Sequence, residues 1–337
     1  MRVGFIGLGN VGSKLAASLC RNGFEVVVRD LDQEAARPLL EQGAEWADTD
    51  RDLAERCALV ITCLPSPTAV CLVMEGTDGV LEGLGPDKIW LEMSTTDPAE
   101  VRRIGELLTS VGAAPMDGPV SGGCHRAASG NISIFVGAER KDFERALPVL
   151  TTLGRRILHV GPLGSASVLK VVTNYLASVH LVALGEALMV ARRSGADLAT
   201  TYEAIRISSG NSFVHETESQ VILNGSYNIN FTMDLVVKDM SLFRQLAEEQ
   251  GTDLEIAPLV LDIFRRGEQA YGSRAWSSGI VRLLEDACGV DLRAEGFPAE
   301  IVDHEPEQPG YEVIPRPPKE NDLGIRLAGF SPTGRSA

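Results

Sequence analysis

The chain opens with a short apolar strand that runs directly into a glycine-rich turn and a helix. Residues 2–12 read Arg-Val-Gly-Phe-Ile-Gly-Leu-Gly-Asn-Val-Gly, and apolar residues at helical spacing follow. This order constrains the fold more than any other feature, because strand, G-x-G-x-x-G and helix form a dinucleotide-binding unit. Gly7 permits the tight turn, Gly9 lets a pyrophosphate approach the backbone, and Gly12 lets the helix lie close to the strand. The residues expected to hold the dinucleotide are Gly7, Leu8, Gly9, Asn10, Val11 and Gly12.

The rest of the chain divides into a half in which predicted strands alternate with helices and a half that is helical only. Apolar runs that predict strands lie at residues 3–6, 26–28, 59–64, 89–93, 132–136 and 157–160. Their alternation with helical stretches predicts a parallel sheet covered by helices. After Gly164 the strand signal ends, and helices are predicted at residues 165–194, 198–207, 234–249, 257–271 and 275–287. The fold class is therefore α/β, a Rossmann-type doubly wound sheet followed by an all-helical C-terminal domain.

The length of 337 residues is too great for one ordinary hydrophobic core. We expect an NAD(P)-binding Rossmann domain at residues 1–162 and a helical domain for substrate binding and oligomerisation at residues 163–289. The helix at 165–194 is apolar nearly all round, so we expect it to be buried on most sides, as a central spine or a subunit interface. Residues 290–337 are rich in proline and predict a tail that is flexible or wraps a surface, either of a neighbouring subunit or at the substrate entrance.

Net charge and composition exclude some classes of binding partner. The net charge of −15 disfavours nucleic acid and membrane surfaces, so an anionic ligand needs a local basic site. No uninterrupted apolar run approaches the roughly 20 residues of a membrane span, and no export signal precedes the first strand, which predicts a cytoplasmic protein. The six cysteines are scattered and form no zinc motif, so we expect no metal site and assign no chemistry to them.

Asp30 stands at the end of the second predicted strand, eighteen residues after Gly12. A carboxylate here accepts hydrogen bonds from the adenosine ribose and repels a 2′-phosphate, which favours NAD over NADP. The neighbouring Arg29 keeps NADP open as the alternative. Asp30 has a second interpretation, as the cap of the next helix.

The loops after two later strands also point towards the cofactor, because ligands bind at the carboxyl ends of parallel strands. Leu64 and Pro65 follow one strand, and Thr95 follows the next. Residues 94–97 also fit the start of a helix at Pro98, and both interpretations can hold together.

Two segments carry the chemistry that reduction of a carbonyl requires, which is a proton donor and a site for an anionic substrate. Ser121, Gly122 and Gly123 leave a strand as a glycine-paired loop that can surround a carboxylate. Lys170 and Asn174 stand four apart in an apolar helix and so share one face. Burial lowers the pKa of such a lysine towards a useful range, whereas a lysine that reaches solvent would be merely structural.

These motifs resemble the β-hydroxyacid dehydrogenase family, typified by 3-hydroxyisobutyrate dehydrogenase and tartronate semialdehyde reductase. The resemblance spans residues 1–288 and rests on residues 5–12, 117–123, 161–174 and 231–239, in the order and spacing of the family. It implies a hydride transfer between NAD(P) and a short-chain β-hydroxy acid, of the 3-hydroxyisobutyrate or 2-hydroxy-3-oxopropionate type.

The resemblance also implies residue roles. Lys170 would be the general acid/base, with Ser121, Gly122, Gly123 and Asn174 holding a small carboxylate substrate. Lys238 would complete the site beside the nicotinamide, and Thr95 would line the cofactor cleft. Family members commonly form homodimers or homotetramers.

The chain departs from the family at Val11, where methionine is usual, at Ala166, where glycine is common, and in the tail beyond the family's usual end. Two other functions remain open on the same scaffold, an imine reductase and a non-catalytic nucleotide-binding module. Lys170 argues against the first, and Lys170, Asn174 and Lys238 together argue against the second. A polar wall of the substrate pocket is expected from Ser208, Ser209, Asn211 and Ser212.

Overall fold

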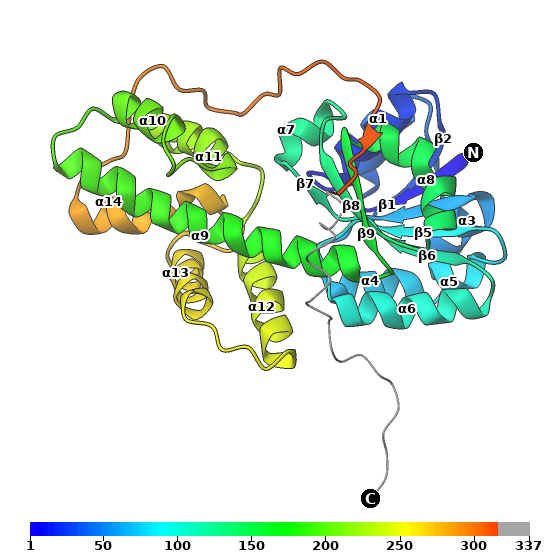
Figure 1. Cartoon of the computed structure of the whole chain (residues 1–337). Helices are drawn as coiled ribbons and strands as arrows, with labels where there is room; N and C mark the ends of the chain where they lie inside the picture. Colours follow the sequence, from blue (N-terminus) through cyan, green and yellow to red (C-terminus); the bar gives the residue numbers. More distant parts are fainter. Residues whose placement is uncertain (316–337) are drawn as a thin grey trace, which may run out of the picture.

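The computed structural model describes residues 1–315 and shows a mixed sheet flanked by helices, followed by a group of helices beside it (Figure 1). The strands are β1 (Arg2–Ile6), β2 (Glu25–Arg29), β3 (Glu45–Trp46), β4 (Leu59–Thr62), β5 (Ile89–Glu92), β6 (Ala114–Asp117), β7 (Val120–Ser121), β8 (Ser133–Gly137), β9 (Arg156–Gly161) and β10 (Tyr311–Glu312). The sheet order is β10-β9-β8-β6-β5-β4-β1-β2-β3, with β7 paired to β8. The predicted α/β fold class is confirmed.

The expectation of an entirely parallel sheet is wrong at one place. β8 runs antiparallel to both β6 and β7, whereas the other pairs are parallel. β7 follows β6 within three residues and does not pair with it. The chain reverses after β7, where residues 122–132 return it as β8, antiparallel to both strands.

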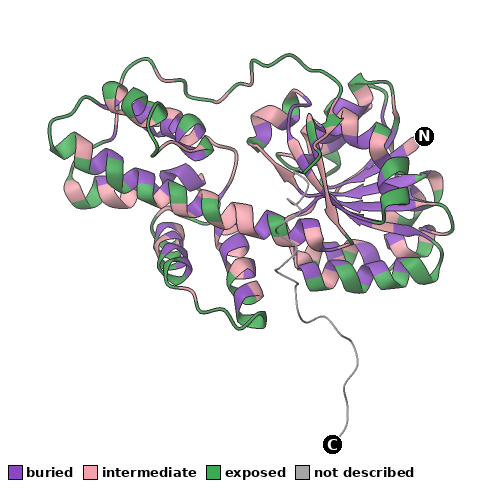
Figure 2. Ribbon diagram, viewed as in Figure 1, coloured by how far each residue is buried: buried purple, intermediate pink, exposed green. Residues whose placement is uncertain are grey.

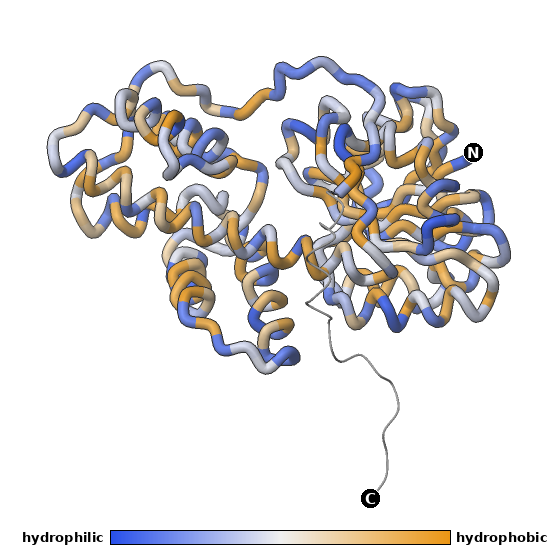
Figure 3. The backbone as a smooth tube through the Cα atoms, viewed as in Figure 1, coloured by the Kyte–Doolittle hydropathy of each residue, from blue (hydrophilic) through white to orange (hydrophobic). Residues whose placement is uncertain are grey.

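Alternating side chains cover the two faces of the sheet. Val3 and Phe5 pack against one layer of helices, and Ile6 packs against the other. The first layer is α1 (Gly12–Arg21), α7 (Gly123–Ala128) and α8 (Arg140–Leu153), and the second is α3 (Asp50–Arg56), α4 (Pro67–Glu75), α5 (Val80–Gly83) and α6 (Pro98–Ser110). The strands are buried and hydrophobic (Figures 2 and 3), as expected for a sheet covered on both sides.

The second half is built on α9 (Ser165–Arg193). Around it pack α10 (Leu198–Arg206), α11 (Phe213–Asn224), α12 (Met233–Glu249), α13 (Ile256–Tyr271) and α14 (Arg282–Cys288). The sequence did not predict α11, because His215, Thr217 and Ser219 are buried among its apolar residues and hide the helical period.

The expectation that α9 is buried on most sides is wrong for the single chain. Leu169, Leu176 and Val190 are 38%, 46% and 66% exposed. The neighbouring helices cover only part of the α9 surface (Figure 2), so an apolar stripe faces outwards. By length and mean hydropathy α9 is the one helix among residues 1–315 that could cross a membrane, but it carries Lys170 and forms the core of the second half.

Residues 290–315, which we call the return segment, run from the helical half back to the sheet (Figure 1). Near its start Arg293 binds Glu285, with Nη1 2.7 Å from Oε1. Further along, Glu307 accepts a hydrogen bond from Asn22 at 2.9 Å, and β10 then pairs with β9 at the sheet edge. The prolines at 317, 318 and 332 of the predicted tail lie outside the described residues.

A buried carboxylate links the two halves. Asp117, at the end of β6, accepts hydrogen bonds from Gly164 N at 2.8 Å and from Ser167 N and Oγ at 2.7 and 2.8 Å. The first turn of a helix has no intrahelical acceptors for its N–H groups, so Asp117 completes the start of α9. Burial raises the pKa of this carboxyl, and its three hydrogen bonds oppose that shift.

We predict that Asp117→Ala lowers the free energy of unfolding by about 3 kcal/mol, because it leaves buried N–H groups without acceptors. Urea denaturation followed by tryptophan fluorescence measures this difference. Asp48→Ala removes an exposed carboxylate and is the matched control, with an expected change below about 0.5 kcal/mol. Equal small effects of both substitutions would show that Asp117 does not stabilise the junction.

Candidate active site

The turn between β1 and α1 leaves room and free donors for a phosphate group. Gly7 has φ +96°, and a Cβ on Gly12 would lie 2.0 Å from Gly7 O, so both positions require glycine. A Cβ on Gly9 would meet no atom within 4 Å. Within residues 1–315, the N–H groups of Gly9, Asn10 and Val11 donate to no acceptor. The turn therefore fits a dinucleotide pyrophosphate, which needs such N–H groups and close access to the backbone.

Asp30 lies directly beside this turn. Its carboxylate accepts hydrogen bonds from Leu8 N at 2.6 Å and from Asp32 N at 2.9 Å. The interpretation of Asp30 as a helix cap is wrong, because Asp32 caps the following helical turn by accepting from Glu34 N. Arg29 points to a different partner, with Nε 3.1 Å from Asp50 Oδ1.

The loops after β4 and β5 meet at the same sheet edge. Leu64 N donates to Ser94 Oγ at 2.7 Å, which joins the two loops, and Pro65 follows Leu64. Beneath them Glu92 is fully buried and binds Thr62 and Ser94 N, and burial raises its pKa to about 7. Asp97 caps α6 by accepting a hydrogen bond from Ala99 N. The loop after β5 therefore lies at this edge of the sheet and also contains the N-cap of α6, so both interpretations of residues 94–97 are compatible.

Ser121, Gly122 and Gly123 connect β7 to α7. Gly122 has φ +127° and Gly123 has φ +86°, a backbone conformation that favours glycine. Ser121 and Gly122 line a cavity of about 360 Å³ that lies between β7, β8 and α7 on one side and α9 and the start of α11 on the other. The full lining is Ser121, Gly122, Arg126, Ser133, Thr173, Leu176, Ala177, His180, Asn211, Ser212, Phe213 and Val214.

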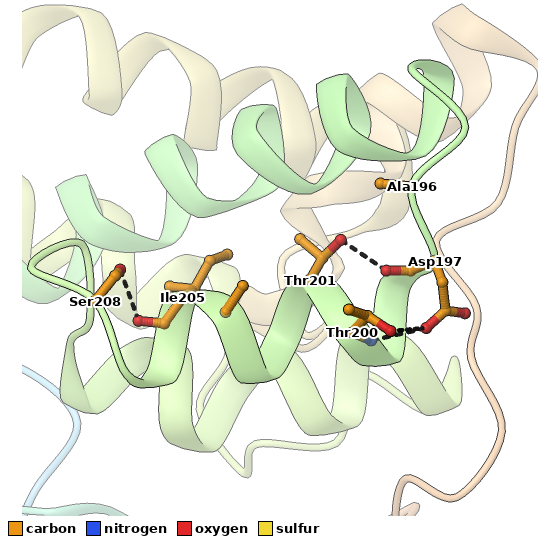
Figure 4. Close-up of a pocket in the computed structure, with 7 residues that line it drawn as sticks. Ala196, Asp197, Thr200, Thr201, Ile205 and Ser208 are labelled. Carbon is orange, nitrogen blue, oxygen red and sulfur yellow. Dashed lines mark hydrogen bonds between the residues drawn. The ribbon is translucent and has the colours of Figure 1, made fainter.

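This lining includes Asn211 and Ser212 of the expected polar wall. Ser208 instead lines a second cavity, of about 570 Å³, along α10 and the loop that precedes it (Figure 4). The polar groups there serve α10 itself, since Asp197 accepts from Thr200 N and Ser208 Oγ donates to Ile205 O. That cavity therefore offers no chemistry.

In the described part of the chain, no group of three His, Cys, Asp or Glu side chains could hold a metal ion.

Two hydrogen bonds and one ion pair join the predicted lysines. Lys170 Nζ donates to Asn174 Oδ1 at 2.7 Å, and Asn174 Nδ2 donates to Asp239 Oδ2 at 2.5 Å. Lys238 Nζ lies 2.9 Å from Asp239 Oδ1 and also donates to the carbonyl of Thr95. The network therefore connects α9, α12 and the loop after β5, so it brings both halves of the chain to one place.

Lys170 is nearly buried, with 9% of its surface exposed. Burial lowers its pKa to about 8, because the ammonium loses hydration; Asp239 opposes this shift and Lys238 adds to it. An amine with this pKa can accept or donate a proton close to neutral pH.

Sequence reasoning missed two residues of this arrangement. Asp239 belongs to the recognised segment 231–239 but was given no role, and the only signal was an acidic residue next to Lys238. Arg126 follows the glycine pair by three residues and lines the cavity, which no local pattern indicated.

Comparisons with known proteins agree with this geometry. Residues 2–161 match the NAD binding domain of 6-phosphogluconate dehydrogenase, and residues 164–284 match the NAD-binding domain of NADP-dependent 3-hydroxyisobutyrate dehydrogenase. A 2-(hydroxymethyl)glutarate dehydrogenase from Eubacterium barkeri is 31% identical over 87% of this chain and 97% of its own length. An NAD-dependent L-serine dehydrogenase from Pseudomonas aeruginosa is 32% identical over 85% of this chain and 98% of its own.

The crystal structure of 3-hydroxyisobutyrate dehydrogenase from Salmonella typhimurium has a TM-score of 0.77 and 28% identity, covering 84% of this chain and 99% of that one. The match therefore runs through both halves and includes the predicted motifs. The chain belongs to the β-hydroxyacid dehydrogenase family, whose members are nicotinamide-dependent oxidoreductases that act on CH–OH groups.

Proposed function

We propose that this protein transfers a hydride between NAD and a short-chain β-hydroxy acid, of the 3-hydroxyisobutyrate or 2-hydroxy-3-oxopropionate type, with Lys170 as general acid/base. The observation that carries the proposal is the buried Lys170, bound to Asn174 with its pKa lowered to about 8. A buried, partly neutral amine is costly in a structural role and suits proton transfer.

The chain's own residues then act as follows. When bound at the turn after β1, the nicotinamide cofactor supplies or accepts the hydride. Ser121, Gly122, Gly123 and Asn174 hold the carboxylate substrate, and Asn174 also keeps the Lys170 amine oriented. In the oxidation direction the neutral amine takes the hydroxyl proton; in the reduction direction the ammonium returns a proton to the carbonyl oxygen.

The proposed preference for NAD rests on Asp30 and Arg29. Asp30 directly follows β2 and lies beside the glycine turn, where a carboxylate suits free ribose hydroxyls. Arg29, the cation that could neutralise a 2′-phosphate, is paired with Asp50 instead. The proposed cofactor contacts are Gly7, Leu8, Gly9, Asn10, Val11, Gly12, Asp30, Leu64, Pro65, Thr95 and Lys238.

We also propose the division into residues 1–162, 163–289 and 290–337, because the sheet strands up to β9 end at Gly161 and α9 begins at Ser165. The exposed apolar residues of α9 support a homodimer or homotetramer with α9 at the interface. The acidic chain and its small carboxylate substrate support a cytoplasmic enzyme without nucleic acid or membrane partners.

Lys170→Ala should lower kcat/KM for hydroxy acid oxidation by roughly 10³-fold, since it removes the proton acceptor. The measurement is absorbance of reduced nicotinamide with a panel of hydroxy acids, using NAD and NADP in parallel. Lys141→Ala removes an exposed lysine of α8 and should leave turnover unchanged. Retained activity in Lys170→Ala would refute the assigned role.

The pH dependence of kcat/KM should follow the protonation state of the Lys170 amine. The neutral form is needed for oxidation, so kcat/KM for oxidation should rise with pH and level off above about 8, and that for reduction should fall there. Asp239→Asn removes the charge that raises the Lys170 pKa, so both midpoints should move to lower pH. An unmoved midpoint would mean that another group controls the profile.

Gly9→Ala and Gly12→Ala should separate cofactor binding from folding. The first adds a methyl group in open space, so stability should hold while the cofactor dissociation constant rises about 10-fold or more. The second places a Cβ against Gly7 O and should cost about 2 kcal/mol of stability. Thermal melts and fluorescence titration with NADH measure the two effects, and unchanged NADH affinity in Gly9→Ala would place the pyrophosphate elsewhere.

A further inference from the structure

The cavity that holds Ser121 and Gly122 contains a cation that the proposed reaction does not use. Arg126 lies on α7, one helical turn after Gly122, and a Cβ on Gly122 would lie 3.2 Å from Arg126 Cδ. The Arg126 stem therefore packs beside Gly122, and its guanidinium lies at the end of that stem, near Phe213 on the opposite wall of the cavity. A cavity of about 360 Å³ is within the range of small-molecule sites.

The surroundings of Arg126 leave its donors available. The guanidinium lies over the ring of Phe213, 5.0 Å from its centroid, so it bridges α7 and the start of α11. Among residues 1–315 the guanidinium donates no hydrogen bond, and the Arg126 side chain is only 24% exposed. A partly desolvated guanidinium with five N–H donors and no acceptor is suited to a carboxylate, which it can bind through two parallel hydrogen bonds.

Two carboxylates of the return segment lie near Arg126. Asp303 accepts hydrogen bonds from Ser129 and Asn131, and Glu305 comes closer to the guanidinium. Glu305 Oε1 lies 3.9 Å from Arg126 Nη2, too far for a hydrogen bond, and the Glu305 side chain is 56% exposed. The Glu305 backbone is fixed, because its carbonyl accepts from Asn131 Nδ2 at 2.9 Å. Glu305 therefore balances the charge of Arg126 at a distance while leaving the face of the guanidinium in the cavity open.

We propose that Arg126 binds a second carboxylate of the substrate, so that the enzyme prefers β-hydroxy acids with two carboxylates over those with one. This proposal rests on the proposed dehydrogenase function and adds the substrate class to it. Glu305 competes with the incoming carboxylate for Arg126 and so weakens, without preventing, its binding.

The test compares two substrates that share the reacting end. 2-(Hydroxymethyl)glutarate has a distal carboxylate, and 2-(hydroxymethyl)pentanoate has a methyl group in its place. The ratio of their kcat/KM values should favour the diacid in the wild type. Arg126→Gln should lower this ratio roughly 30-fold, because a charge-assisted pair is lost, and Arg126→Lys should restore part of it as a point charge.

Glu305→Gln should raise the ratio a few-fold through a lower KM for the diacid, and Glu300→Gln, an exposed glutamate of the same segment, is the matched control. A ratio that stays within about 3-fold of wild type in Arg126→Gln overturns the proposal. An equal loss of kcat/KM for both acids would also overturn the proposal, since Arg126 would then hold the carboxylate that the two acids share.

Calorimetric titration of the NADH-loaded protein with the two acids gives their affinities without turnover, because reduced cofactor cannot accept a hydride from a hydroxy acid. If the wild type turns over 3-hydroxyisobutyrate and Arg126→Gln leaves the acid preference unchanged, the second-carboxylate site is refuted and the proposed dehydrogenase function stands. If the wild type turns over no hydroxy acid, the proposed function is refuted. The difference between the calorimetric affinities of the two acids then still decides whether Arg126 binds the second carboxylate.

Discussion

The hydrogen bonds that Asp117 accepts from the start of α9 determine where the site lies. Asp117 stands at the carboxyl end of β6, and Ser167, which donates to it, precedes Lys170 by three residues. The end of a sheet strand and the first turn of a 29-residue helix are thus joined at one buried carboxylate. Lys170 lies one turn further along α9, at the sheet edge where parallel strands present their ligands. This junction, together with the contact of Lys238 with the Thr95 carbonyl, keeps the lysine on the same side of the sheet as the glycine turn.

Local patterns predicted what depends on local geometry. The glycine turn, the strand ends and the shared face of Lys170 and Asn174 follow from spacing along one element, and the structure places them as expected. Asp239 could not be predicted as the partner of Asn174, because 65 residues separate them and only the packing of α12 on α9 brings them together. The antiparallel β8 was missed because strand direction depends on the loop before it, not on the strand's own apolar residues.

The distribution of charge also depends on tertiary structure. A chain with net charge −15 repels anions over most of its surface. Lys170 and Lys238 come from two helices that are far apart in sequence and meet through Asn174 and Asp239. Arg126, on a third helix, lines the cavity that also contains Ser121. A local positive site within an acidic protein gives an anionic ligand one favourable place to bind, and the composition alone indicated only that such a site was needed.

The return segment changes how the two halves can move. The chain passes from sheet to helices through α9 and comes back through residues 290–315, which are attached at both ends, by Arg293 to Glu285 and by β10 to β9. Residues 294–310, between these two attachments, have little regular structure and act as a tether of fixed length. A tether does not fix the direction in which two bodies move, but it limits how far apart they can go, because an extended chain spans at most about 3.6 Å per residue. The return segment therefore sets an upper limit on how far the helical half can move away from the sheet.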